Sequence, residues 1–127
     1  TTPQLMAQKV ATRVADMAKR SFIPLLGVIE NMSYFESDTG DKYNIFGEGG
    51  GEALSDKFGI PLLGKVPISE NTNNVADSGT PLIDQNNSIT KVEIKKLINN
   101  SAIQLPPIID ETCTGRLAKV FEELSNQ

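Results

Sequence analysis

Two continuous apolar segments of the chain begin with the same five residues. The sequence Ile-Pro-Leu-Leu-Gly occurs at residues 23–27 and again at residues 60–64, and each copy leads into a short apolar run. The copies start 37 residues apart (60 minus 23), about the length of one strand–helix–strand unit. Because a strand covered by helices on both faces is apolar without interruption, the pattern predicts two parallel strands, at about 25–30 and 62–66.

Helical periodicity is clearest in the first twenty residues. Apolar side chains recur at the spacing of one helix face from residue 4 to about residue 20, at Met6, Val10, Val14 and Met17. Thr2 is expected to be the N-cap of this helix and Pro3 its first helical residue. No strand and no initiator Met precede this entry, so we expect the chain to be part of a longer protein.

Further helices are predicted between and after the two strands. One extends over about 52–58 and is closed by Gly59. A short helix is expected at 71–77, another at 92–99, and the terminal helix carries an apolar stripe of Leu117, Val120, Phe121 and Leu124. Residues 33–46 are predicted to form a polar loop.

A glycine cluster, residues 47–51, immediately precedes the second helix. Backbone N–H groups of glycines at a helix N-terminus can bind an anion. However, the Lys-Ser/Thr pair of a Walker A loop is missing, and Glu48 and Glu52 would repel phosphate. The composition therefore favours a tight structural connection over an anion site.

The bulk composition excludes several classes of function. The net charge of −4 and the absence of clustered cations argue against nucleic-acid binding. The chain has no histidine, which excludes Ser-His-Asp chemistry and imidazole metal sites. Cys113 is the single cysteine, so there is no internal disulfide, and no apolar run approaches the ~20 residues of a membrane span. A reducing compartment is expected.

Two residues at the predicted strand ends have chemistry that suits a nucleobase. The amide of Asn31 has a donor and an acceptor that can pair with an adenine edge. Pro67 follows the neighbouring strand and offers an apolar surface on which a purine ring can stack. Parallel sheets bind ligands beyond the carboxyl ends of their strands. The structural alternative is an asparagine that caps a turn and a proline that ends a strand.

Several ordered motifs together resemble a known family. They are residues 1–4 (TTPQ), 26–35 (LGVIENMSYF), 45–52 (IFGEGGGE), 61–68 (PLLGKVPI) and 77–81 (DSGTP). The series is similar to the Mrp/ApbC family of P-loop ATPases, which are relatives of MinD and ParA that carry iron–sulfur clusters to target proteins. The resemblance covers about residues 1–83. Residues 84–111 do not match well and are interpreted as a divergent or inserted segment.

The resemblance implies an α/β fold: residues 1–127 would be the carboxy-terminal part of one P-loop ATPase domain, a mostly parallel, helix-covered sheet. In the family the Walker A and switch motifs lie upstream of the TTPQ motif, so this chain is expected to be inactive alone. Asn31 matches the family asparagine that reads adenine, and Pro67 matches the proline beside the base. No catalytic and no metal-binding residue is assigned in this chain.

The resemblance also implies cofactors and partners for the whole protein. These are ATP with Mg²⁺, a homodimeric state, and apoprotein targets that receive an iron–sulfur cluster, with no nucleic acid or membrane as partner. The family's Cys-x-x-Cys pair is missing here, so ligands for a cluster are not evident, and Cys113 is interpreted as a packed side chain. The expected location is the cytoplasm, or a mitochondrion or plastid in a eukaryote.

Two alternatives from other functional classes remain open at this point. One is a MinD/ParA-like positioning ATPase that recruits partners to a surface. The other is a non-enzymatic interaction module that retains half of an ATPase fold. A lipid- or DNA-binding assay discriminates the first, and a phosphate-binding loop ahead of Thr1 would argue against the second.

Overall fold

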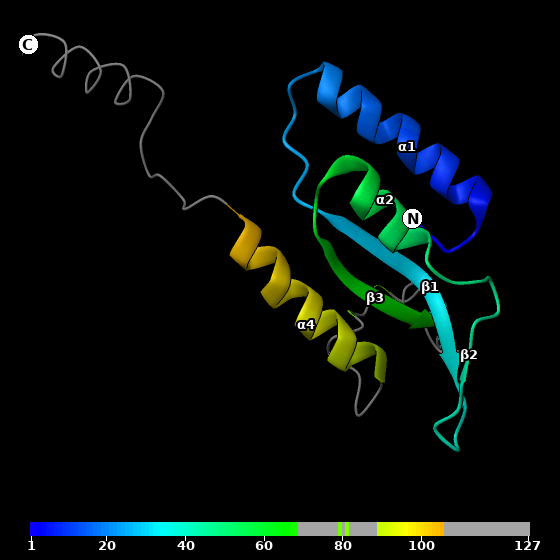
Figure 1. The fold of residues 1–127 in the computed structure, drawn as a ribbon. Helices are drawn as coiled ribbons and strands as arrows, with labels where there is room; N and C mark the ends of the chain where they lie inside the picture. Colours follow the sequence, from blue (N-terminus) through cyan, green and yellow to red (C-terminus); the bar gives the residue numbers. More distant parts are fainter. Residues whose placement is uncertain (69–78, 80, 82–88, 106–127) are drawn as a thin grey trace, which may run out of the picture.

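The fold is that of a small three-stranded sheet with helices on both faces (Figure 1). The computed structural model describes residues 1–68, 79, 81 and 89–105. Its elements, in chain order, are α1 (Leu5–Arg20), β1 (Val28–Glu36), β2 (Lys42–Tyr43), α2 (Gly50–Phe58), β3 (Leu62–Ile68) and α4 (Ile89–Gln104).

The strands are arranged in the order β2-β1-β3. β1 and β3 are parallel, with Val28 opposite Leu62, which confirms the prediction from the repeated pentapeptide. β2 is antiparallel to the distal end of β1, with Phe35 opposite Tyr43. The single α2 crossover between β1 and β3 is the connection that parallel neighbours require.

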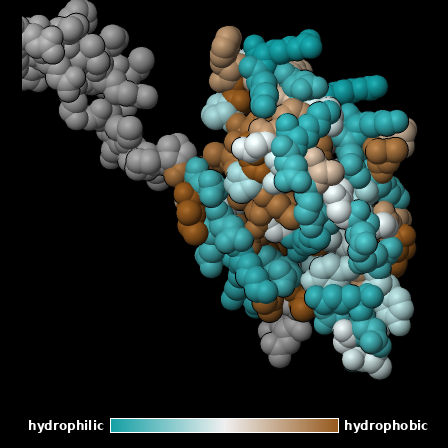
Figure 2. Space-filling view, viewed as in Figure 1, coloured by the Kyte–Doolittle hydropathy of each residue, from teal (hydrophilic) through white to brown (hydrophobic). Residues whose placement is uncertain are grey.

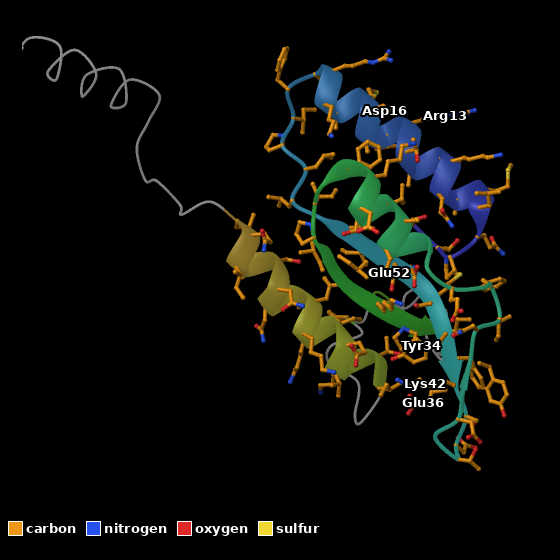
Figure 3. The ribbon with its side chains drawn as sticks, in the orientation of Figure 1. Arg13, Asp16, Tyr34, Glu36, Lys42 and Glu52 are labelled. Atoms are coloured by element: carbon orange, nitrogen blue, oxygen red, sulfur yellow. The ribbon has the colours of Figure 1, made fainter. Side chains whose placement is uncertain are left out.

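The first strand differs from the prediction at both ends. It begins at Val28 rather than residue 25 and continues to Glu36, through residues that the sequence assigns to a polar loop. The extension exists because Lys42 and Tyr43 supply a partner strand, a long-range pairing that polar composition does not reveal. The Lys42 ammonium lies 4.5 Å from the centre of the Tyr34 ring and 3.9 Å from the Glu36 carboxylate, which ties the two strands together (Figure 3).

Helices cover both faces of the sheet. α2 packs against β1 and β3 on one face, and α1 lies against α2. α4 packs against β3 on the opposite face, where the Leu97 side chain lies beside Gly64 (Figure 1). This arrangement confirms the α/β class. The first repeated segment nevertheless lies before β1 and is partly exposed, with Ile23 56% and Leu26 38% exposed.

The first helix begins later than predicted and packs through a different face. Its N-cap is Gln4, without a side-chain cap, so the prediction of Thr2 as N-cap is wrong. Small residues face the body of the protein, and Ala18 is the buried one. The apolar stripe of the helix is exposed in the described structure, at Met6, Val10, Val14 and Met17. Hydrophobic side chains accordingly reach the surface over α1 and the loop after it (Figure 2).

The other predicted helices are confirmed where the structure describes them. α2 begins at Gly50, two residues earlier than expected, and ends at Phe58. Gly59 follows it as the cap, and its φ of 64° is the left-handed conformation that glycine favours. α4 confirms the helix predicted at 92–99 and is longer at both ends. The predicted helix at 71–77, the connector 84–88, the terminal helix and Cys113 lie outside the described residues. Among the described helices, none has the length and apolarity needed to span a membrane.

Candidate functional site

The two residues proposed for base binding belong to neighbouring parallel strands. Asn31 lies directly opposite Val66 in the ladder between β1 and β3, and Pro67 follows Val66. Asn31 is exposed, whereas Pro67 is buried. The structure therefore brings the two residues to the same level of the sheet, although Asn31 lies within β1 rather than after its end.

The amide of Asn31 has one local contact. Its Oδ1 accepts the N–H of Met32 at 2.9 Å, and among the described residues its Nδ2 donates no hydrogen bond. This is the turn-capping contact of the structural alternative, but it occupies only one of the amide's groups. An amide oxygen has two lone pairs, so a donor and an acceptor both remain for a ligand.

The first residues of the chain lie along the other edge of β1. The Thr1 ammonium donates to the Ile29 carbonyl at 2.9 Å, and the Asn31 N–H donates to the Thr1 carbonyl at 2.7 Å. Thr1 thus bonds to the two neighbours of Glu30, the residue opposite it, and this is the hydrogen-bond pattern of a parallel ladder. Thr2 and Pro3 are thus level with Asn31, and the Thr2 hydroxyl is buried without a hydrogen bond in the described structure.

Glu30 is a fully buried carboxylate that sequence reasoning did not single out. Its Oε1 accepts the Ser33 hydroxyl at 2.5 Å, and its Oε2 accepts the Gly51 N–H at 2.5 Å. The Lys65 ammonium lies 3.8 Å from Oε1. A buried charge is tolerated only when it is paired and hydrogen-bonded, and these three contacts from β1, α2 and β3 meet that condition.

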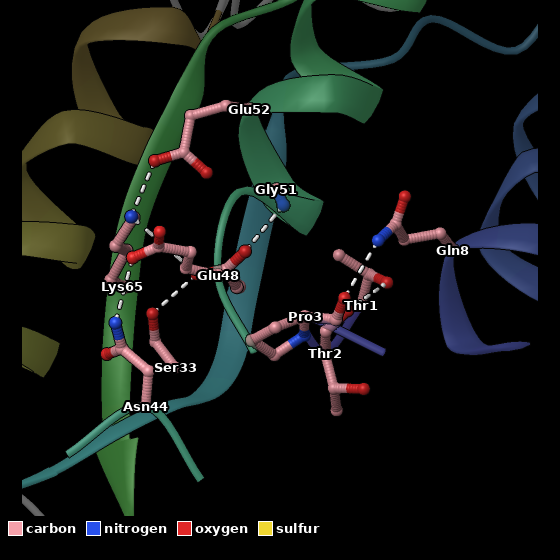
Figure 4. A network of polar contacts seen from close by, with 11 residues as sticks. Thr1, Thr2, Pro3, Gln8, Ser33, Asn44, Glu48, Gly51, Glu52 and Lys65 are labelled. Carbon is pink, nitrogen blue, oxygen red and sulfur yellow. Dashed lines mark hydrogen bonds and ion pairs between the residues drawn. The ribbon is translucent and has the colours of Figure 1, made fainter. Parts of the chain in front are cut away.

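Lys65 links this buried group to the surface of α2. Its ammonium lies 2.5 Å from the Glu52 carboxylate, which is partly exposed (Figure 4). The hydrogen bond with Lys65 lowers the pKa of Glu52 below its ordinary value. The same bond raises the pKa of Lys65, with smaller contributions from the charges of Glu52, Glu30 and Glu48.

The glycine cluster allows close packing and does not form an anion site. A Cβ atom on Gly50 would lie 2.8 Å from the Cα of Pro3, and one on Gly51 would lie 2.9 Å from the Cβ of Glu30. The Gly51 N–H already donates to the Glu30 carboxylate, so the N-terminus of α2 binds a negative charge from within the protein. This supports the prediction of a tight structural connection.

The described residues offer binding chemistry and no catalytic constellation. They contain no group of three or more acidic, histidine or cysteine side chains placed to hold a metal ion. An apolar groove of about 340 Å³ lies between α1, α2 and β1, lined by residues that include Val14, Val28 and Leu54. Thr1 is the one polar residue in its lining, and its hydroxyl already donates to the Thr2 carbonyl, so the groove has little with which to read a nucleobase.

Comparisons with known proteins agree on one family. Residues 1–102 match the model of the NUBPL iron-transfer P-loop NTPase family, within the ParA group. Iron–sulfur cluster carrier proteins of Deinococcus radiodurans and Pyrococcus furiosus are 46% and 44% identical over 84 residues, 65% of this chain. The Bacillus subtilis carrier is 36% identical over 92 residues. The chain spans about a quarter of the length of these relatives, 23%, 28% and 26% respectively.

A solved structure shares the fold. It is a nucleotide-binding protein from Archaeoglobus fulgidus in complex with ADP, which is 32% identical to this chain and superposes with a TM-score of 0.53. The match covers 62% of this chain and 33% of the other.

Proposed function

The chain belongs to the NUBPL iron-transfer P-loop NTPase family, and on that premise we propose that it is the carboxy-terminal part of an ATP-dependent iron–sulfur cluster carrier. In this proposal the chain supplies the adenine-binding side of the nucleotide site. The phosphate-binding loop and the Mg²⁺ ligands come from sequence outside these 127 residues. The relatives' names, iron–sulfur cluster carrier protein, support the cargo, and the ADP complex of the structural neighbour supports the nucleotide.

The observation that carries the proposal is the placement of Asn31. An exposed amide with a donor and an acceptor available stands beside Val66 on the adjacent parallel strand. This is the hydrogen-bonding pattern that an adenine edge requires. Pro67 is assigned to the apolar contact with the purine ring. Because Pro67 is buried, the ring can reach it only if neighbouring atoms move aside.

The donor set of the described residues fits a nucleobase and does not fit a triphosphate. The N-terminus of α2, where a phosphate would be attracted, is occupied by the Glu30 carboxylate. Hydrolysis would therefore depend on groups from elsewhere in the carrier. We propose that the whole carrier is a homodimer that transfers iron–sulfur clusters to apoprotein targets, in the cytoplasm or an organelle. Ligands for the cluster are not evident in this chain, whose single cysteine, Cys113, we interpret as a packed side chain.

A hybrid carrier tests the proposal. Residues 1–127 are joined to the part of the Deinococcus radiodurans carrier that precedes the matched region, and ATP and GTP affinities are measured by calorimetry. We expect ATP binding within about tenfold of the parent carrier. Asn31→Ala should weaken ATP by about tenfold, the value of a lost pair of amide hydrogen bonds, and leave GTP unchanged.

The matched control is Asn99→Ala, which removes an exposed amide from α4. It should leave both affinities unchanged. A folded hybrid that binds ATP equally well with and without the Asn31 amide would refute the assignment of this residue to adenine.

A further inference from the structure

The spacing of Glu30 and Ser33 on β1 does not agree with a regular strand. Successive side chains of a strand point to opposite faces, so residues three apart lie on opposite sides of the sheet. Here the Ser33 hydroxyl reaches the Glu30 carboxylate at 2.5 Å, and both residues are buried. The alternation is therefore reset somewhere between them.

The reset occurs at Met32. This residue has a φ of 53°, a left-handed conformation that side chains other than glycine rarely adopt. The ladder between β1 and β3 shifts register between Asn31 and Phe35, as expected of a bulge. Within this irregular segment the Met32 N–H donates to the Asn31 side chain, which fixes the orientation of the amide.

The Glu30 carboxylate anchors this bulge to the rest of the fold. Its second oxygen is held by the Gly51 N–H of α2, and the Lys65 ammonium of β3 lies close to the first. The Ser33 hydroxyl is therefore bonded to a carboxylate that is itself held in place. The strain at Met32 is retained because this bond holds the residue after it.

We propose that Glu30 and Ser33 are positioning residues that hold the Asn31 amide in the orientation needed to read adenine. The inference rests on the proposed function, because it deepens the role of the same site. Neither residue touches the base: each acts through the bulge at Met32. The preference for adenine is thus set by a buried contact on the face of the sheet opposite the exposed amide.

The test uses Ser33→Ala in the hybrid carrier described above, followed by two-dimensional ¹H–¹⁵N NMR. Without any ligand, the Met32 amide should exchange with solvent about tenfold faster, because its bond to Asn31 Oδ1 is no longer held in place. On titration with ATP, the Asn31 side-chain resonances should move in the wild type and respond about tenfold more weakly in the variant. GTP should move them in neither protein.

Ser37→Ala is the matched control. It also removes a serine hydroxyl with a side-chain partner, but from the exposed turn after β1. Its Met32 exchange and ATP response should equal those of the wild type. If Ser33→Ala does not fold, the double variant Met32→Gly, Ser33→Ala replaces it, since glycine adopts positive φ without strain. Compared with Met32→Gly alone, the double variant should show the same loss.

The outcomes separate the two proposals. A folded Ser33→Ala chain with unchanged Met32 exchange and unchanged ATP response would overturn the positioning role. A wild-type hybrid whose Asn31 resonances do not respond to ATP, in which Ser33→Ala still accelerates Met32 exchange, would refute adenine binding and keep the structural control of the amide.

Discussion

Glu30 on β1 and Lys65 on β3 are directly opposite each other in the parallel ladder, and the lysine ammonium lies 3.8 Å from the buried carboxylate. The same carboxylate accepts hydrogen bonds from Ser33 and from the backbone of α2. One side chain on an apolar strand thus joins three elements, immediately before the residue proposed to bind the base. Its removal should lower the free energy of unfolding of the whole fold.

Glu30→Ala is expected to destabilise the protein by about 2–4 kcal/mol, because it leaves the Ser33 hydroxyl and the Gly51 N–H buried without partners. Urea denaturation measures the difference in the free energy of unfolding. Glu48→Ala serves as the control: this glutamate is exposed and accepts a hydrogen bond from Asn44, so its loss should cost less than about 0.5 kcal/mol. Equal costs for the two variants would contradict the central role of Glu30.

Gly51→Ala should be costly for steric reasons alone. Its new Cβ would lie 2.8 Å from Leu62 Cδ1 and 2.9 Å from Glu30 Cβ, so the helix or the strand must shift. Overpacking of this kind costs about 1–3 kcal/mol. Gly47→Ala separates this effect from backbone strain, because Gly47 has a φ of 87° and open space around it. The Gly47 variant should lose about 1 kcal/mol in chemical denaturation. The Gly51 variant would contradict the prediction if it unfolded like the wild type.

The sequence predicts the framework of the fold but not the site's internal contacts. The repeated pentapeptide points to β1 and β3 because each copy leads into a strand: the first copy ends at Gly27, just before β1, and the second continues into β3. Strands covered by helices on both faces favour apolar runs over strict alternation, and Glu30 and Lys65 are the charged exceptions. Gly59 marks the end of α2 because a left-handed cap favours glycine. Both are local features whose physical cause lies within a few residues.

Features that depend on distant partners were not predictable in this way. The burial of Glu30 depends on Gly51 and Lys65, which are 21 and 35 residues away (51 minus 30, 65 minus 30). A glutamate inside an apolar strand, followed by a serine three residues later, was the available signal. The exposed stripe of α1 was missed because periodicity shows which residues share a face, not which face is covered.

The pH dependence of stability should reveal the ion pair between Glu52 and Lys65. Because the hydrogen bond lowers the pKa of Glu52, its contribution is present above the ordinary glutamate pKa of about 4.3 and fades as the pH falls through the lowered pKa. The raised pKa of Lys65 has the opposite sign: its contribution is complete below the ordinary lysine pKa of about 10.4 and is lost as the pH rises through the raised pKa.

Glu52→Gln isolates the acidic limb of this dependence. The wild type should be more stable than the variant by less than about 1 kcal/mol near pH 7, since both side chains are partly exposed. The difference should shrink from about pH 5 downward in denaturation curves. Asp56→Asn, at an exposed position on the same helix without an ion pair in the described structure, removes the same charge and should change stability near pH 7 by less than about 0.5 kcal/mol. A gap between wild type and Glu52→Gln that stays constant to about pH 3 would rule out the pair as its source.

The 127-residue chain alone should not hydrolyse ATP. Phosphoryl transfer requires cations and backbone donors around the transferred group, and the one glycine-rich helix start in the described structure is occupied by Glu30. Phosphate release at millimolar ATP and Mg²⁺ should therefore equal that of an identically purified Asn31→Ala chain, which serves as the contamination control. Hydrolysis by the wild type that disappears in Asn31→Ala would show a complete catalytic site in this chain, and would overturn the assignment of phosphate binding to sequence outside it.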